Sequence, residues 1–184
     1  MAHIDRRPGI RPRQSVGRRL DIAARIGFPT TITILLMLLT RAPMDIPEQA
    51  ALLPAVALCC VWFWSVFRPD ALPPPIVFLL GLLMDLLGYL PLGVGVFTLL
   101  AVHGVALVLG RDLSQRGFAS IWFVFAGVAA AASLVIWLLV MLLTLRLLSP
   151  YPAIFIGVVT IAIFPVLAVP FAGAHRSIAN PDHA

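Results

Sequence analysis

The chain has 184 residues, of which 61% are hydrophobic and 11% charged, and 13 basic against 8 acidic side chains give a net charge of +5. A soluble domain carries about 25% charged and about 45–50% apolar residues, so this composition excludes an ordinary water-soluble domain and predicts an integral membrane protein. The basic residues are all arginines and cluster in an N-terminal tail rather than along a folded face, which argues against nucleic-acid binding.

Six apolar segments predict six transmembrane helices. They run over Ile22 or Ile26–Thr40, Ala50–Phe67, Pro75–Leu90, Leu92–Leu109, Phe118–Leu145 and Tyr151–Ala174. About 20 helical residues are needed to cross the hydrocarbon core. The third and fourth segments are shorter, which predicts a hairpin whose turn does not fully leave the membrane. The fifth is longer, which predicts a tilted helix or one that projects beyond the bilayer.

Three regions are expected along the chain. Residues 1–20 form an Arg-rich cytoplasmic tail with too little apolar surface to fold alone, so we expect this tail to be disordered. Residues 21–175 form one transmembrane domain. Residues 176–184 form a short second cytoplasmic tail.

The distribution of arginines predicts the orientation of the chain. With six spans and a cytoplasmic N-terminus, eleven arginines fall on the inner side and only Arg41 and Arg146 on the outer side. This asymmetry follows the positive-inside rule and places both termini in the cytoplasm. We also expect Trp62 and Trp64 to belong to the inner aromatic belt and Tyr151 to the outer one.

The third segment contains a carboxylate, Asp85, within an uncharged run. An ionisable side chain at the centre of a membrane helix costs roughly 2.5–3.5 kcal/mol on insertion scales, so it needs a compensating role. Gly81, Asp85 and Gly88 share one helix face. In a tight hairpin turning near Pro91, the hydroxyl of Thr98 is the expected hydrogen-bond partner of Asp85. Two roles remain open: a functional latch or ligand contact in an outward-facing cavity, and a structural tie between the third and fourth spans.

The residue inventory predicts that the chain is not an enzyme and holds no cofactor or metal. Ser133 lacks the Gly-x-Ser-Gly frame of an intramembrane serine protease. Asp85 has no second intramembrane acid with which to form a catalytic pair. His103 has no further ligands at a spacing suited to a metal, and Cys59 and Cys60 are expected to be small buried hydrophobes.

The stretch around Asp85 resembles the signature of the rod shape-determining MreD family, which is approximately Gly-Leu-x-x-Asp, a short spacer and Pro-Leu-Gly. The chain length, the six predicted spans and a basic segment after the fourth span are also similar. The residues of the motif and its hairpin are Gly81, Asp85, Gly88, Pro91, Leu92 and Gly93.

The resemblance implies a non-enzymatic component of the bacterial cell-elongation complex in the inner membrane. Such a protein pairs with the bitopic protein MreC and works alongside MreB, RodA and a class B transpeptidase in peptidoglycan synthesis. The chain could also form a homodimer, and this alternative stays open. The family fold resembles the substrate-binding component of energy-coupling-factor vitamin transporters. The alternative hypothesis is therefore a small-molecule binder, which would need an outer pocket lined with polar groups.

The arginines next to the first span have two interpretations. Arg18, Arg19 and Arg25 either contact anionic lipid, at about 1 kcal/mol for each charge near the surface, or only set the topology. Membrane lipid is a predicted partner under the first interpretation.

Overall fold

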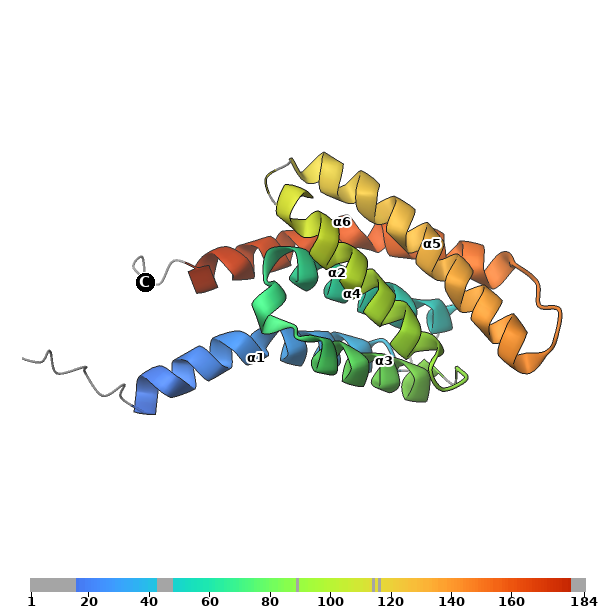
Figure 1. Cartoon of the computed structure of the whole chain (residues 1–184), viewed down its shortest axis with the longest axis horizontal. Coiled ribbons are helices and arrows are strands. Elements are labelled where there is room, and N and C mark those ends of the chain that lie inside the picture. The colour runs from blue at the N-terminus through green and yellow to red at the C-terminus, as the bar shows by residue number, and fades with distance from the viewer. Residues whose placement is uncertain (1–15, 43–47, 89, 114, 116, 180–184) are drawn as a thin grey trace, which may run out of the picture.

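The computed structural model describes residues 16–42, 48–88, 90–113, 115 and 117–179, which form a helical bundle without strands. For residues 16–26 and 174–179 only the backbone is described. Each predicted segment coincides with one long helix, so the all-helical fold class is confirmed (Figure 1). The elements are α1 (Val16–Leu39), η1 (Gln49–Ala51), α2 (Leu52–Phe67), η2 (Pro69–Ala71), α3 (Pro74–Gly88), α4 (Val94–Leu113), α5 (Phe118–Thr144) and α6 (Tyr151–Ala179).

Four stretches are long and apolar enough to cross a membrane: Gln49–Phe67, Val94–Leu113, Phe118–Thr144 and Tyr151–Gly173. The stretch Gly27–Leu39 of α1 and the whole of α3 are apolar but shorter. These helices have the composition and length expected of a membrane protein. Six complete spans and the placement of the termini stay predictions. Of the tails predicted at residues 1–20 and 176–184, residues 1–15 and 180–184 lie outside the described residues, whereas residues 16–20 belong to α1 and residues 176–179 to α6.

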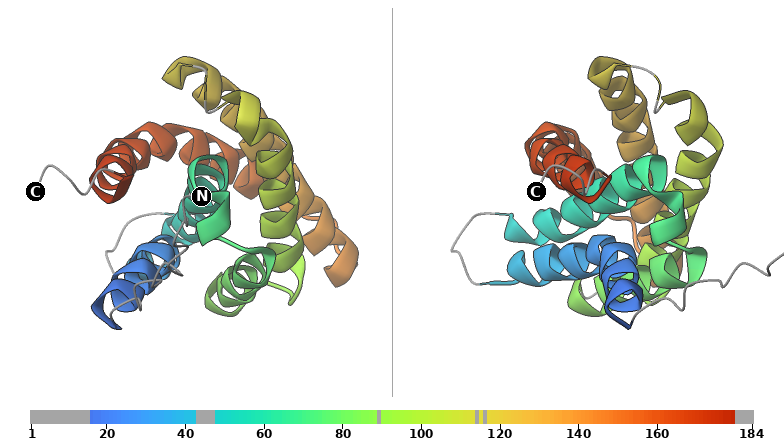
Figure 2. Two further views of the ribbon diagram at one scale, coloured as in Figure 1. Left: turned by 60° about the vertical axis from the view of Figure 1, so that its left-hand side comes forward. Right: turned by 90° about the vertical axis from the view of Figure 1, so that its left-hand side faces the viewer.

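Helix α2 forms the centre of the bundle. Its apolar stretch is 83% buried, whereas those of α5 and α6 are each 28% buried. A helix that is apolar on all sides is stable when neighbours surround it, and α2 contacts α1, α3, α4 and α6. Figure 2 shows α2 between α1 on one side and α6 on the other. These four helices therefore share one buried partner.

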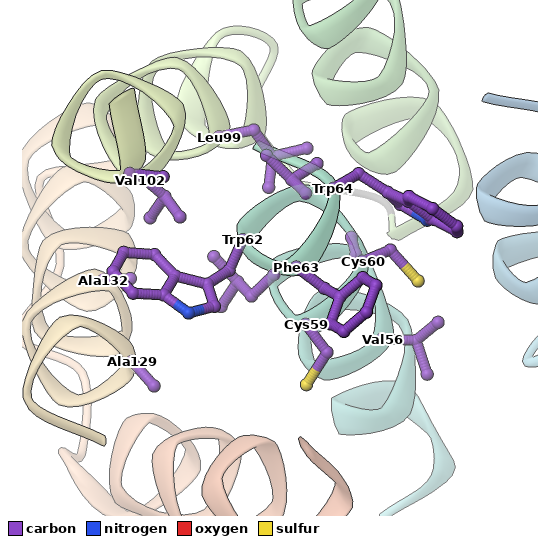
Figure 3. Packing of buried hydrophobic residues seen from close by; sticks show 14 of the residues in the cluster. Val56, Cys59, Cys60, Trp62, Phe63, Trp64, Leu99, Val102, Ala129 and Ala132 are labelled. Carbon is purple, nitrogen blue, oxygen red and sulfur yellow. The ribbon is translucent and has the colours of Figure 1, made fainter. Parts of the chain in front are cut away.

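The prediction that Trp62 and Trp64 are belt residues is wrong. Both indoles are fully buried, and Figure 3 shows Trp62 within the core. Trp62 packs on Phe125 of α5 with ring centroids 5.7 Å apart, and Trp64 packs on Phe171 of α6 at 5.3 Å. The position of a residue along a span indicates its depth in the membrane but not whether its side of the helix faces lipid. The prediction used depth alone, and for this reason it places two core aromatics at the interface.

Helices α5 and α6 are joined by a hydrogen bond that depends on a proline. Pro165 has no N–H group, so the carbonyl of Ile161 lacks its usual donor four residues later. The indole Nε1 of Trp122 on α5 donates to that carbonyl at 3.2 Å. The partner helix thus satisfies the acceptor that the proline leaves open.

The end of α1 is tied to the start of the central helix by Gln49. Its side-chain amide donates to the carbonyl of Thr40 at 2.9 Å and also to the carbonyl of Ala42. Both carbonyls follow Leu39, the last residue of α1, so the amide satisfies acceptors just beyond the end of the helix. The α3–α4 turn lies at this same end of the bundle.

Candidate functional site

The motif residues of α3 lie against the first turn of α4, where the backbones of the two helices nearly touch. A Cβ atom placed on Gly81 would lie 2.5 Å from Cα and 2.8 Å from N of Val96. Real Cβ atoms do not approach backbone atoms so closely, so any larger residue would force the helices apart. Gly81 is therefore a contact point between α3 and α4, as its shared face with Asp85 predicts.

One turn further along α3, Asp85 is 1% exposed and bonds to the N-terminus of α4. Its Oδ1 atom accepts a hydrogen bond from the backbone N–H of Gly95 at 2.6 Å, and its Oδ2 atom accepts one from that of Gly93 at 2.8 Å. The first N–H groups of a helix have no carbonyl partner within it, and they carry the positive end of the helix dipole. Asp85 thus caps α4 from a neighbouring helix.

This cap explains how a carboxylate is accommodated in an apolar run. Both oxygens accept hydrogen bonds from backbone N–H groups, so each of them has a partner within the protein. A buried polar group that is hydrogen-bonded avoids most of the cost of losing its contact with water. The helix N-terminus therefore supplies what a basic side chain would otherwise provide.

The turn can reach Asp85 because two of its residues are glycines. Gly93 has a φ angle of +102°, which residues with a side chain rarely adopt. A Cβ atom on Gly95 would lie 2.6 Å from Oδ1 of Asp85 and 2.9 Å from the carbonyl oxygen of Gly81. Both positions therefore require glycine for the carboxylate to contact the backbone.

The remaining motif residues shape the turn. The carbonyl of Pro91 accepts a hydrogen bond from the N–H of Val94 at 3.2 Å. Leu92 is 67% exposed at the tip. Gly88 ends α3 and lies in ordinary contact with the side chains of Leu53 and Leu90. Gly88 and Leu92 do not touch the carboxylate, although they belong to the same sequence motif.

The predicted hydrogen bond between Thr98 and Asp85 is not formed. Thr98 is buried, and its hydroxyl donates instead to the carbonyl of Val94 at 2.7 Å, one turn earlier in the same helix. A helical threonine readily bonds to the carbonyl four residues before it, and the backbone of Gly93 and Gly95 already satisfies the carboxylate. The partners of Asp85 are thus main-chain groups.

Sequence reasoning missed Gly95 as a site residue and did not identify the N–H groups as donors. A usable signal was present, because Gly93 and Gly95 bracket the start of a helix that has no Ser, Thr, Asp or Asn to cap it locally. The start of such a helix needs a hydrogen-bond acceptor from elsewhere. When the other helix of the same hairpin carries a buried carboxylate, this indicates that the carboxylate caps the helix.

A second polar contact joins α2 and α4 at a different level. Ser65 Oγ lies 2.7 Å from Nδ1 of His103, and both residues are buried. His103 is therefore a buried histidine that is hydrogen-bonded to a neighbouring helix. Among the described residues, no three His, Cys, Asp or Glu side chains gather as a metal site would require.

Among the cavities that flank the hairpin helices, two have charged residues in their walls. One of 160 Å³ lies at the turn and is lined in part by Glu48, Gly88 and Leu90. Another of 680 Å³ lies at the far end of α4, where Asp70 and Arg111 form part of its wall. Ligand sites of proteins typically measure about 300–1,000 Å³, so the cavity beside the motif is smaller than such sites.

Arg18 and Arg19 lie in the first turn of α1, and Arg25 lies further along the same helix. Their side chains are outside the described part of the structure, so the predicted lipid contacts stay predictions. A scan against protein-family models finds no match, and neither curated proteins nor solved structures give a significant one.

Proposed function

We propose that the chain is a non-enzymatic inner-membrane component of the bacterial cell-elongation complex, of the MreD type. In this role it holds an MreC-like bitopic protein beside the enzymes of peptidoglycan synthesis. The observation that carries the proposal is the bonding of Asp85 to the N–H groups of Gly93 and Gly95. Because this bonding occupies both carboxylate oxygens within the chain, the motif serves to build a rigid hairpin and needs no substrate.

We further propose that all six long helices cross the membrane with both termini in the cytoplasm. Eleven arginines against two support this orientation. The short α3 is compatible with a span because its turn to α4 is held by hydrogen bonds within the protein, and irregular backbone is tolerated at membrane depth where protein covers it. The membrane then surrounds a compact scaffold with a buried centre.

The scaffold role is better supported than the vitamin-transporter alternative. A substrate-binding component needs a cavity of ligand size at its outer end, with polar groups pointing into it. Two cavities lie towards that predicted end. The one at the α3–α4 turn measures 160 Å³, and Asp85 directs both oxygens at the backbone rather than into it. The other, between α5 and α6, measures 360 Å³, but its lining is mainly apolar, and the side chains of Ser133 and Trp137 in its wall already donate to main-chain carbonyls. A saturable micromolar ligand and a coupling partner would nevertheless reverse this preference.

The experiment that tests the proposal is depletion of the protein in its own bacterium followed by complementation. Depletion should turn rod-shaped cells round, and the wild-type protein should restore rods and co-purify with an MreC-like protein. Asp85→Leu should restore neither shape nor co-purification at equal membrane abundance. The matched control Asp70→Asn changes an exposed acid and should behave as wild type. Normal shape after complete depletion would overturn the proposal.

A further inference from the structure

The hairpin between α5 and α6 projects beyond the rest of the molecule (Figure 1). The leucines of its turn are exposed. Leu145, Leu147 and Leu148 are 88%, 96% and 39% exposed, and we call these three residues the leucine tip. Turns in water are usually made of Gly, Pro, Asn, Asp and Ser, so a turn rich in leucine needs another explanation.

The leucine tip is held in place by hydrogen bonds rather than hanging free. The indole Nε1 of Trp137 donates to the carbonyl of Leu148 at 3.2 Å, and Ser149 Oγ accepts from the N–H of Tyr151 at 3.3 Å. Leu145 ends α5 with φ 52° and ψ 32°, the left-handed position where glycine is usual. A leucine placed there at a conformational cost, with its side chain outside the fold, contributes little to folding.

The surroundings of the tip are also apolar. Leu142, Leu143 and Tyr151 are exposed beside it. Arg146 is the only charged residue between residues 118 and 175. In water, such a surface would form a contiguous apolar patch of the kind that soluble proteins avoid. The patch is continuous with the apolar outer faces of α5 and α6, which are mostly unburied within the chain.

The length of α5 relates this patch to the bilayer. Its 27 residues span about 40 Å, whereas the hydrocarbon core is about 30 Å thick. A tilt of about 40°, at the upper end of the range for membrane helices, would keep the whole helix within the core. A smaller tilt would place the tip at the headgroups. In either case, acyl chains are within reach of the leucines.

We propose that the leucine tip inserts into the phospholipid leaflet on its side of the membrane, with Arg146 reaching up to the lipid phosphates. The leucines supply the apolar contact, and Arg146 and Tyr151 supply the interfacial one, because long cationic and aromatic side chains place their polar ends at the headgroups. The arginine asymmetry predicts that this leaflet is the outer one. The inference requires only that the chain lies in a membrane, so it stands or falls separately from the role in cell elongation.

The test uses the full-length protein in nanodiscs of phosphatidylethanolamine and phosphatidylglycerol. A cysteine introduced as Leu147→Cys is labelled with an environment-sensitive fluorophore, and the buried Cys59 and Cys60 set the background. Lipid carrying a shallow spin label should quench the fluorophore at least twofold more than aqueous iodide does. The control Asp70→Cys lies in the exposed η2 turn and should show the opposite preference.

Two results would overturn the inference. Quenching by iodide as strong as at position 70 would place the tip in water. Protection from both quenchers would indicate that protein, either a second copy or a partner, covers the tip. A second label at Leu142→Cys, one turn back along α5 and 66% exposed, should be quenched by the lipid at least as well. Stronger iodide quenching there than at position 147 would also contradict insertion.

Discussion

At the scale of single residues, the carboxyl group of the buried Asp85 is stabilised by backbone donors of the described residues. Asp85 accepts hydrogen bonds from the N–H of Gly95, in the first turn of α4, at 2.6 Å and from that of Gly93, just before the helix, at 2.8 Å. The arrangement works because a helix start offers unpaired donors and a positive dipole end at the same point. The site is thus a reciprocal arrangement, in which the carboxylate needs the helix start and the helix start needs the carboxylate.

The loss of stability caused by a substitution at Asp85 should depend on how many hydrogen-bond acceptors remain. Asp85→Asn keeps one oxygen acceptor but turns an NH₂ group towards the other donor, so we expect a loss of about 1–3 kcal/mol. Asp85→Leu leaves both N–H groups buried without a partner, so we expect a loss about twice as large. SDS-induced unfolding in micelles would measure both, with Asp70→Asn as an exposed control. Equal losses would show that charge, rather than acceptor number, decides.

Gly81 should tolerate no side chain. In Gly81→Ala, the new Cβ atom would meet the backbone of Val96 at 2.5 Å, so α3 and α4 must separate and the hydrogen bonds of Asp85 must lengthen. Overpacking of this kind typically costs about 1–3 kcal/mol. Gly104→Ala is the matched control, since it is also helical and has open space around its Cβ position. Thermal unfolding in detergent should show a lower midpoint for the first variant alone.

At the scale of elements, the packing of α5 on α6 depends on a proline and an indole together. Trp122→Phe would leave the carbonyl of Ile161 without a donor, because Pro165 has no N–H to offer. We expect this variant to lose about 1–3 kcal/mol of stability. Adding Pro165→Ala restores a backbone N–H four residues after Ile161, so the same tryptophan substitution should cost less in that background. A double-mutant cycle measures the difference, and additive effects would contradict the coupling.

The sequence predicted the helices well because hydropathy reports burial in either protein or lipid. All six segments are helices, and most ends lie within about four residues of the predicted ones. The exceptions are α1, which begins at Val16 rather than at Ile22 or Ile26, and α6, which ends at Ala179 rather than at Ala174. The same property explains why Trp62 and Trp64 were wrongly predicted to lie at the membrane interface. An apolar helix such as α2 has the same hydropathy whether lipid or other helices surround it. The partners of Asp85 were missed for another reason: they are main-chain groups, which carry no side-chain signature, and the predicted donor Thr98 bonds within its own helix.

At the scale of the whole molecule, the lengths of the helices limit the ways in which the bundle can cross a membrane. Four helices are long enough to span it, whereas α3 has 15 residues, or about 22 Å of helix. In both a six-span arrangement and one in which α3 and α4 form a re-entrant hairpin, Pro74 and Leu113 lie on the same side. The two arrangements differ at the turn, where Leu92 is 67% exposed.

We predict that Leu92 is accessible from the outer side. In spheroplasts, a membrane-impermeant maleimide should label the full-length variants Leu92→Cys and Glu48→Cys, while Asp70→Cys and Asp112→Cys should react only after permeabilisation. The physical reason is the excess of arginines beside Asp70 and Asp112, which holds those turns in the cytoplasm. The buried Cys59 and Cys60 leave the unmodified protein as the background. If Glu48→Cys reacts but Leu92→Cys stays unlabelled in spheroplasts, the hairpin is re-entrant, and the Asp85 cap then holds a turn that never leaves the lipid.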